Sequence, residues 1–168
     1  MADELTAIDV KILEILQQDA ALSTTELAER VGLSQSPCWR RLQRLKDEGY
    51  IQRQVAVLNR RKFGESQYIF ATLKIAALTE DQRNEFNRQV MAIPEIMECH
   101  SIFGDRDILI KVIARSLDWY QNFILSTILK LPGVLDVRST VALNEIKHTS
   151  AIPVKGNGNG NGNGNGSR

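Results

Sequence analysis

The chain has 168 residues, 43% of them hydrophobic, and its 21 basic and 20 acidic side chains give a net charge of +1. This hydrophobic content suffices for a folded core and excludes a disordered or fibrous chain. The sequence has no apolar run of about 18 residues and no signal-peptide pattern at its start, so we expect a cytoplasmic protein with no membrane partner. Two cysteines and two histidines cannot supply a disulfide framework or a metal cluster of known spacing, so we expect no bound metal.

The near-neutral total conceals a separation of charge along the chain. Residues 1–29 carry one basic and seven acidic side chains, residues 30–62 carry nine basic and two acidic ones, and residues 63–168 carry eleven of each sign. The basic stretch is typical of a surface that binds an anionic partner, although a solvated helix face would look the same. The placement of these basic residues within the predicted elements has to decide between the two interpretations.

Three helices are predicted within the first 50 residues. Residues 6–9 and 23–26 each match a capping box, in which a hydroxyl is followed three residues later by a carboxylate, and these boxes begin the first two helices. Gly32 ends the second helix, because glycine tolerates the positive φ of a helix terminus. Ser34 begins a third helix that runs to about Glu48. Two helices joined by a three-residue turn containing glycine form the outline of a helix-turn-helix.

The third predicted helix carries the candidate DNA-binding surface. Cys38, Leu42 and Leu45 cluster on one side and predict the face toward the core, whereas the opposite side is polar and basic. Hydroxyl, amide and guanidinium groups in the N-terminal half of such a helix can hydrogen-bond base edges and phosphates in a major groove. The candidate DNA-binding residues of this helix are Ser34, Gln35, Ser36, Pro37, Trp39, Arg40, Arg41, Gln43 and Arg44.

Some of these positions allow a second interpretation. Trp39 flanks the polar face and fits a partly buried packing residue better than a DNA contact. Cys38 fits a small buried core residue better than a redox sensor, because a sensor requires a lowered thiol pKa. Tyr50 to Leu58 predicts a short β-hairpin wing, with Arg53 near a neighbouring phosphate. The run Arg60-Arg61-Lys62 that follows is either a solvated linker or a further phosphate contact.

The remaining sequence predicts a second domain of four strands and two helices. The strands are expected at 67–78, 96–103, 108–114 and 134–146, and the helices at 79–92 and 116–131. This β-α-β-β-α-β order is the ferredoxin-like arrangement, with both helices on one face of the sheet, and gives an α+β fold overall. Because the strands are apolar, we expect the uncovered face to pack against a second copy of the chain.

The expected domain organisation has four parts. Residues 1–59 form a winged helix-turn-helix, 60–66 a hinge, 67–154 a sensing and oligomerisation domain, and 155–168 a tail. Alternating Gly and Asn in the tail cannot bury apolar area and predict a flexible segment. The sequence allows both a native low-complexity tail and an added one.

Taken together, the motifs resemble the Lrp/AsnC, or feast/famine, family of transcriptional regulators. The resemblance covers about residues 5–154. The motifs that carry it are Ile8-Asp9 with Ile12-Leu13, Leu27 to Ser34, Ser36 to Leu45, Gly49-Tyr50-Ile51, Glu98-Cys99-His100, Gly104 to Lys111, and Leu131-Pro132-Gly133-Val134. The resemblance implies a sequence-specific regulator that binds double-stranded DNA as a homodimer and assembles further into octamers, with a C-terminal domain of the RAM type.

The same resemblance implies an amino acid or related metabolite as effector and no other cofactor. The effector site of the family corresponds to the turn between the second and third strands, which here is Gly104, Asp105, Arg106 and Asp107. Glycine permits a tight turn with exposed N–H groups for a carboxylate, and Asp105 or Asp107 can pair with an ammonium group. A solvated turn has the same composition, but the resemblance favours Asp107, and Asp105 less, as an effector contact. The family often has an aromatic residue in place of Arg106, which favours an acidic or differently shaped effector here.

Two other classes of protein fit the sequence less well. A βαββαβ domain can carry catalysis, but the sequence has no nucleophile elbow, phosphate-binding glycine loop or metal cluster, so we expect no enzyme. A winged-helix sensor of metals or oxidants would use Cys38 and Cys99, whose positions in two different domains argue against one shared site.

Overall fold

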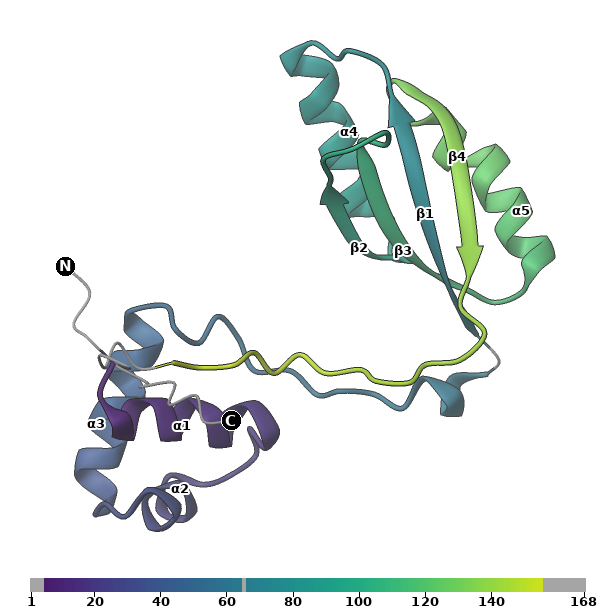
Figure 1. Ribbon diagram of the computed structural model, residues 1–168. Helices are drawn as coiled ribbons and strands as arrows, with labels where there is room; N and C mark the ends of the chain where they lie inside the picture. Colours follow the sequence, from purple (N-terminus) through teal and green to yellow (C-terminus); the bar gives the residue numbers. More distant parts are fainter. Residues whose placement is uncertain (1–4, 65, 156–168) are drawn as a thin grey trace, which may run out of the picture. The chain divides into compact units, whose positions relative to one another are not determined.

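The computed structural model describes residues 5–64 and 66–155, with Arg61 described by its backbone alone, and the chain divides into two compact units (Figure 1). The second unit is Leu58–Lys147, and the first contains residues 5–57 together with residues 148–155. The expected boundary at residue 154 therefore differs from the structure, which groups residues 148–155 with the helical unit. The predicted glycine and asparagine tail from residue 156 lies outside the described residues.

The first unit is built on three short helices. They are α1 (Ala7–Gln18), α2 (Thr24–Val31) and α3 (Gln35–Asp47). Both predicted capping boxes are present, and Gly32 ends α2 in the left-handed conformation at φ 74°. Ser34 occupies the N-cap position of α3, but its side chain makes no capping hydrogen bond. The core contains the fully buried side chains of Ile12, Leu27, Cys38 and Leu45.

The C-terminal segment completes this unit from the far end of the sequence. The side-chain amide of Gln17 on α1 donates to the carbonyl of Ile152 at 3.1 Å and accepts from the N–H of the same residue at 2.7 Å. Val154 packs against the core of the three helices. These contacts are the physical reason for the changed boundary, because residues 148–155 have no strand of the second unit to pair with.

The predicted β-hairpin wing is not formed. Residues 51–59, all described by the structure, contain no strand or helix. Nine residues leave only three or four for each strand, and the segment lacks the Asn-Gly or Asp-Gly pair that a two-residue hairpin turn favours. A hairpin this short, without a third strand, is at best marginally stable in water. Arg53 therefore lies on an exposed, irregular segment.

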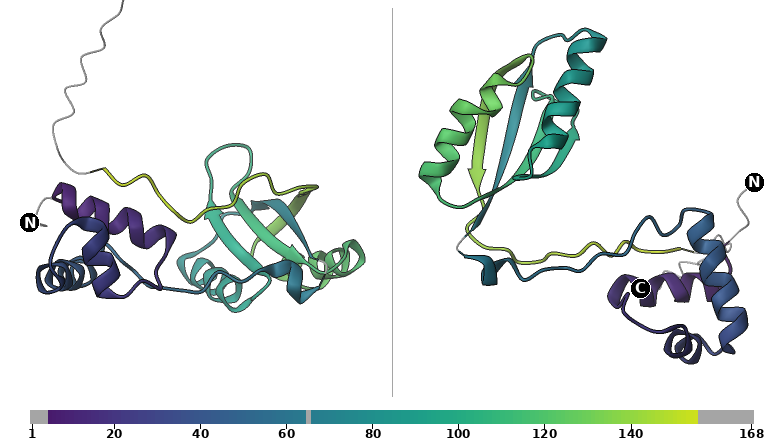
Figure 2. Two further views of the ribbon diagram at one scale, coloured as in Figure 1. Left: turned by 90° about the horizontal axis from the view of Figure 1, so that it is seen from below. Right: turned by 180° about the vertical axis from the view of Figure 1, so that it is seen from behind.

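The second unit is the expected β-α-β-β-α-β arrangement. Its main elements are β1 (Gln67–Ile75), α4 (Glu80–Ala92), β2 (Ile96–Ser101), β3 (Ile108–Ala114), α5 (Leu117–Ser126) and β4 (Val134–Val141), with short 3-10 turns at Arg60–Phe63 and Ile128–Lys130. The strand order is β2-β3-β1-β4, and every pairing is antiparallel. Helices α4 and α5 cover the same face of the sheet (Figures 1 and 2). The predicted α+β fold class is confirmed.

Four predicted element ends differ from the structure. The second strand ends at Ser101 instead of residue 103. The last helix stops at Ser126, where Thr127 leaves helical geometry and a 3-10 turn takes the chain on to Lys130. The last strand ends at Val141 instead of residue 146, because its partner β1 begins only at Gln67. The first strand ends at Ile75 rather than at residue 78, and the N–H of Ala76 then bonds to the carbonyl of Gly133. A strand extends only as far as its neighbour offers hydrogen-bonding groups.

Successive side chains of each strand point to opposite sides of the sheet, which gives the sheet a core face and an open face. Ile69, Ala71 and Leu73 of β1 are fully buried and pack with the corresponding residues of β3 against the two helices. On this face the hydroxyl of Tyr120 in α5 lies 2.7 Å from that of Ser139 in β4. The intervening residues of each strand form the open face, whose contacts are described below.

Candidate DNA-binding and effector sites

The candidate DNA-binding residues gather along α3 but differ in exposure. Ser34, Gln35, Ser36, Trp39 and Arg40 are exposed, whereas Pro37, Arg41, Gln43 and Arg44 are half-buried. Trp39 is 52% exposed, so about half of its surface is open to a partner. Cys38 is fully buried, and burial raises the pKa of its thiol, as expected of a core residue rather than a sensor.

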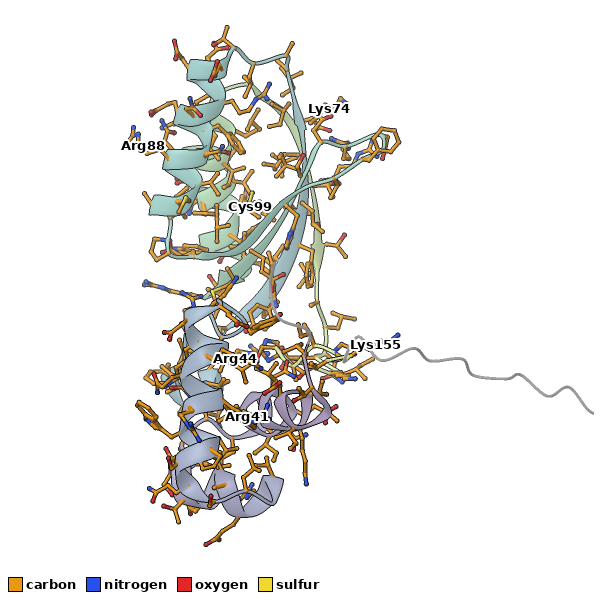
Figure 3. All side chains as sticks on the ribbon, turned by 90° about the vertical axis from the view of Figure 1, so that its left-hand side faces the viewer. Arg41, Arg44, Lys74, Arg88, Cys99 and Lys155 are labelled. Atoms are coloured by element: carbon orange, nitrogen blue, oxygen red, sulfur yellow. The ribbon has the colours of Figure 1, made fainter. Side chains whose placement is uncertain are left out.

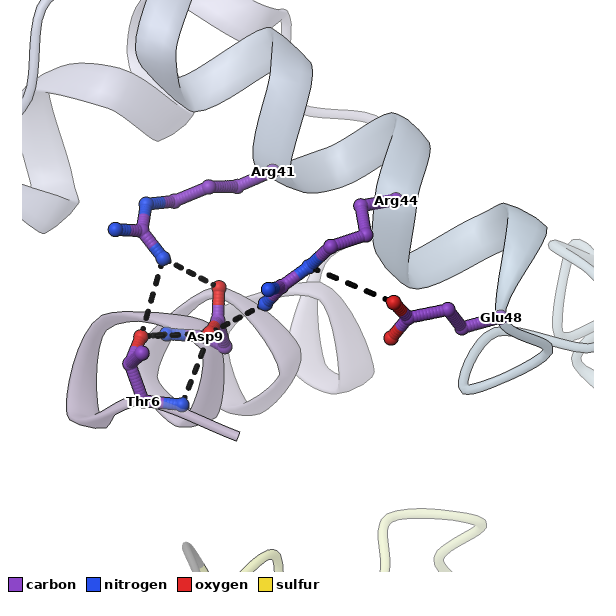
Figure 4. A network of polar contacts seen from close by, with 5 residues as sticks. All are labelled: Thr6, Asp9, Arg41, Arg44 and Glu48. Atoms are coloured by element: carbon purple, nitrogen blue, oxygen red, sulfur yellow. Dashed lines mark hydrogen bonds and ion pairs between the residues drawn. The ribbon is translucent and has the colours of Figure 1, made fainter. Parts of the chain in front are cut away.

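A buried carboxylate lies between α1 and α3. Asp9 is fully buried in the first turn of α1, and its Oδ2 accepts hydrogen bonds from the backbone N–H and the hydroxyl of Thr6, at 2.9 and 2.6 Å. Two guanidinium groups of α3 reach the same carboxylate (Figure 4): Nη1 of Arg41 is 3.0 Å from Oδ1, and Nη2 of Arg44 is 2.7 Å from Oδ2. The carboxylate is therefore bound by donors from two helices.

The surroundings of Asp9 keep it ionised. Burial alone raises the pKa of this carboxyl group, but the hydrogen bonds from Thr6 and Arg41 and the charge of Arg44 outweigh burial and hold the pKa below its usual value. Nε of Arg44 also lies 4.0 Å from a carboxylate oxygen of Glu48, one helical turn further along α3. The cluster thus contains two half-buried arginines, the buried carboxylate of Asp9 and, at its edge, the carboxylate of Glu48.

This cluster corrects the placement of Arg44. Helical spacing predicts Arg44 opposite the core side of α3, but its guanidinium group faces α1 and binds Asp9 (Figures 3 and 4). Sequence reasoning assigned Asp9 to the capping box only and missed this contact. The signal was present, because Asp9 lies three and four residues before the buried Ile12 and Leu13 and so shares their side of α1.

The predicted effector turn connects β2 and β3 and is held by its own chain. The N–H of Ile102 bonds to the carbonyl of Asp107 at 2.9 Å, and the N–H of Asp107 bonds to the carbonyl of Leu73 in β1 at 3.0 Å. Gly104 has φ 151°, a conformation that side chains rarely adopt. Beside it, Phe103 and Asp105 are exposed. The exposed part of the turn is therefore the tip at 103–105.

Arg106 and Asp107 already have partners within the chain. The Arg106 side chain is only 9% exposed, and its Nη1 lies 2.6 Å from a carboxylate oxygen of Asp136 in β4. One carboxylate oxygen of Asp107 accepts from the N–H of Ile75 at 2.7 Å, and the other lies 3.2 Å from Nζ of Lys74. The hydrogen bond from Ile75 and the contact with Lys74 lower the pKa of Asp107. Of the two aspartates expected to pair with an ammonium group, only Asp105 is exposed.

The open face of the sheet combines apolar side chains with charge pairs. Tyr68 lies opposite Ile113 across β1 and β3, and Phe70 lies opposite Lys111. Nζ of Lys111 is 2.9 Å from the carboxylate of Glu98 in β2 and 4.6 Å from the centre of the Tyr68 ring. The guanidinium group of Arg60 lies over the same ring at 4.5 Å. The face therefore mixes apolar side chains with charged ones, and Lys111 on the inner strand β3 lies among the apolar side chains.

Comparison with known proteins identifies the family. A model described as the Lrp/AsnC ligand binding domain matches residues 68–152, and one described as winged helix-turn-helix DNA-binding matches residues 5–52. The leucine-responsive regulatory protein of Escherichia coli K12 is 37% identical over 152 residues, which cover 90% of this chain and 93% of that protein. The chain belongs to the Lrp/AsnC family. It is therefore a DNA-binding transcriptional regulator with a ligand-binding domain, as the motifs predicted.

Solved structures of Lrp/AsnC regulators agree with this assignment. A transcriptional regulator from Neisseria meningitidis, solved as a complex with L-Met, has a TM-score of 0.84 at 36% identity and covers 89% of this chain and 96% of its own. An AsnC family regulator from Agrobacterium tumefaciens has a TM-score of 0.83 at 35% identity, with 88% and 96% covered. The N-terminal helical unit and C-terminal sheet of this chain are thus the domains of this family.

The alternative sensing hypotheses receive no support from the geometry. Cys38 lies in the core of the first unit and Cys99 on β2 of the second. Across residues 5–64 and 66–155, no group of three or more His, Cys, Asp or Glu residues could hold a metal ion. No helix in that same part of the chain is long and apolar enough to cross a membrane.

Proposed function

We propose that this Lrp/AsnC regulator reads a palindromic site in double-stranded DNA through α3. The observation that carries the proposal is the exposed N-terminal half of α3, where Ser36 and Arg40 present a hydroxyl and a guanidinium group beside the half-buried amide of Gln43. Such groups distinguish base pairs by hydrogen bonding in the major groove. Ser34, Gln35, Pro37, Trp39 and Arg53 border this surface, and Arg41 and Arg44 add positive charge that attracts phosphates.

The test is binding to a fragment from the promoter of the protein's own gene and to random DNA of equal length. Specific binding should weaken as salt is raised, since Lys and Arg contacts to phosphates release counterions. Arg40→Ala should cost about 1–3 kcal/mol of specific binding free energy, whereas Arg83→Ala, an exposed arginine of α4, should change little. An unchanged ratio of specific to random affinity in Arg40→Ala would remove Arg40 from the base-reading residues.

An amino acid is the proposed effector, with the turn at 104–107 as its site. The L-Met bound by the Neisseria relative supports this chemistry. Because Arg106 and Asp107 bind Asp136, Ile75 and Lys74, we assign them to shaping the turn. Gly104 and Asp105 at the exposed tip then contact the effector, with Asp105 pairing with its ammonium group.

A thermal-shift screen of the amino acids tests this assignment. A ligand that binds only the folded protein raises its stability by mass action, so the cognate amino acid should raise Tm at concentrations above its Kd. The same shift should be reduced in Asp105→Ala and retained in Asp118→Ala, an exposed aspartate in the first turn of α5. If none of the amino acids shifts Tm at millimolar concentration, the effector class is wrong.

We further propose a homodimer through the open face of the sheet, assembling to an octamer. Tyr68, Phe70, Leu109 and Ile113 are apolar side chains of this face, and β2 and β4 are its edges. Phe70→Glu should reduce the mass measured by sedimentation, whereas Met91→Glu on α4 should not, although Met91 is 88% exposed. An unchanged mass in Phe70→Glu would exclude this face as the interface.

The same proposal assigns no catalytic role and no cofactor other than the amino acid. A regulator of this type acts in the cytoplasm, where its DNA is found, without a membrane partner. Turnover of the amino acid identified in the thermal-shift screen would contradict it, and can be checked by following that compound over hours with excess protein.

A further inference from the structure

A cavity lies between α4 and α5, on the helical side of the sheet in the second unit. Its volume is about 350 Å³, which is enough for a small organic molecule. The end of α4 and the loop before β2 form one wall, and α5 forms the other. Because β2 runs from this loop to the turn at 102–107, the cavity and the proposed effector turn lie at opposite ends of that strand (Figure 1).

The wall formed by α5 is aromatic. Trp119, Asn122, Phe123 and Ser126 follow the i, i+3, i+4, i+7 spacing of one helical face, and all four line the cavity. The rings of Trp119 and Phe123 stack, with their centres 4.9 Å apart and their planes at 15°. The hydroxyl of Ser126 donates to the backbone carbonyl of Asn122 at 2.6 Å and is thus used within α5. This wall therefore offers an apolar, aromatic surface with the side-chain amide of Asn122 beside it.

The opposite wall brings a carboxylate to this aromatic surface. Glu95 lines the cavity from the loop after α4, and its backbone carbonyl accepts from the N–H of Ile113 in β3 at 2.9 Å, which holds the loop on the sheet. The Glu95 residue is half-buried, and within the described part of the chain its carboxylate has no hydrogen bond or ion pair. A carboxylate that has lost part of its hydration without gaining a partner is stabilised by a cation.

We propose that this cavity is a binding site for a small primary amine with an aryl or alkyl body. The ammonium group pairs with Glu95, and the body lies on Trp119 and Phe123, where burial of its apolar surface contributes affinity. The indole ring of Trp119 adds attraction for the same cation. An amino acid fits less well, because its own carboxylate would be repelled by Glu95. The inference is independent of the proposed DNA and effector sites.

Fluorescence of Trp119 tests the inference in the full chain. The sequence has two tryptophans, so Trp39→Phe leaves Trp119 as the reporter. Phenethylamine, which is protonated at pH 7, is the probe. It should change the emission of Trp119 in a saturable way, with a Kd of about 0.1–1 mM for a ligand of this size. An emission that does not change at millimolar phenethylamine overturns the inference.

The role of the charge is tested by changing it on each side of the pair. 2-Phenylethanol has the same body without the ammonium group, and Glu95→Gln keeps the size of the side chain without the carboxylate. Either change should weaken binding about tenfold, and the two together should cost little more than one alone. Glu80→Gln removes an exposed carboxylate from the first turn of α4 and should keep the affinity for phenethylamine. Equal affinities of Glu95→Gln and Glu80→Gln for phenethylamine would exclude Glu95 as the partner.

Two further variants establish where the amine binds. Ala92, the exposed last residue of α4, lines the cavity, so Ala92→Phe should fill part of it and weaken both phenethylamine and 2-phenylethanol about tenfold or more. Asp105→Ala removes the exposed carboxylate of the effector turn and should leave phenethylamine binding unchanged. Unchanged binding in Ala92→Phe, or lost binding in Asp105→Ala, would place the amine outside this cavity and overturn the inference.

Two competing occupants are tested with the same reporter. L-Phenylalanine carries the same aryl group and ammonium group with an added carboxylate, and it should bind at least tenfold more weakly than phenethylamine. Tighter binding of L-phenylalanine would make the cavity an amino-acid site instead. If phenethylamine binding is lost as the protein concentration is raised, a second copy of the chain occupies the cavity and the assignment to a small amine is wrong.

Discussion

At the scale of single residues, Asp9 makes the first unit sensitive to acid. Its pKa is lower in the folded chain than in the unfolded one, so it contributes stability at pH values above the unfolded pKa, near 4. That contribution is lost as pH falls through the folded pKa. We expect amide hydrogen exchange in α3 to speed up as the pH is lowered from 5 to 3, after correction for the intrinsic exchange rate.

Asp9→Asn should flatten this dependence, because the substituted side chain cannot take up a proton over that range. Glu29→Gln, an exposed carboxylate of α2 in the same unit, is the control and should leave the dependence as in the wild type. An equal pH dependence in Asp9→Asn and wild type would assign the acid sensitivity to other groups.

Arg106 gives a second prediction at this scale. Its side chain is nearly buried, and its guanidinium group pairs with the carboxylate of Asp136. Its methylene groups therefore pack within the second unit while its charge is paired at the surface. Arg106→Ala should lower the free energy of unfolding by about 1–3 kcal/mol through lost packing and the loss of the ion pair. Asp105→Ala, in the same turn but exposed, should stay within about 0.5 kcal/mol in urea unfolding without effector. Equal effects of the two substitutions would show that Arg106 has no structural role.

At the scale of elements, Gly133 joins the 3-10 turn at Ile128–Lys130 to β4 in a way that alanine cannot. Its φ is +74°, and a Cβ at this position would overlap Cδ2 of Leu78. Gly133→Ala should therefore cost about 2–4 kcal/mol, part from the left-handed backbone and part from overpacking. Combining it with Leu78→Ala should recover the overpacking part, measured as a double-mutant cycle in urea unfolding. Additive effects would mean that the structure accommodates the methyl group without strain.

The elements also show what sequence could and could not predict. Both capping boxes and the β-α-β-β-α-β order were predictable, because caps and periodicity are local patterns. The end of β4 at Val141 and the absence of the wing at 51–59 were not, because they depend on which neighbouring strand is present. In the candidate sites, the exposed residues of α3 follow from helical spacing. The partners Asp9 for Arg44 and Asp136 for Arg106 lie far away in sequence, and no local pattern pairs them.

At the scale of the whole molecule, residues from both ends of the sequence build one unit. A chain ending at Lys147 would lack the Ile152 hydrogen bonds to Gln17 and the packing of Val154. We expect faster hydrogen exchange in α1 of this truncated chain, by a loss of about 1–3 kcal/mol of local stability, with exchange in β1 and β3 unchanged. Leu143 is 98% exposed in the connecting segment, so Leu143→Ser should change hydrogen exchange neither in α1 nor in β1 and β3. Unchanged exchange in α1 after truncation would show that residues 148–155 add nothing to the helical unit.

The hydrogen bonds between Gln17 and Ile152 also determine when the first unit can complete its folding during translation. The two residues are 135 positions apart, and a ribosome adding about 5–20 residues per second makes the second one roughly 7–27 s after the first. The three helices, although synthesised first, must wait for the whole sheet to be translated before their last contacts can form. The DNA-binding unit of a nascent chain is thus incomplete until the ligand-binding unit has been made, which couples the maturation of the two within a single round of translation.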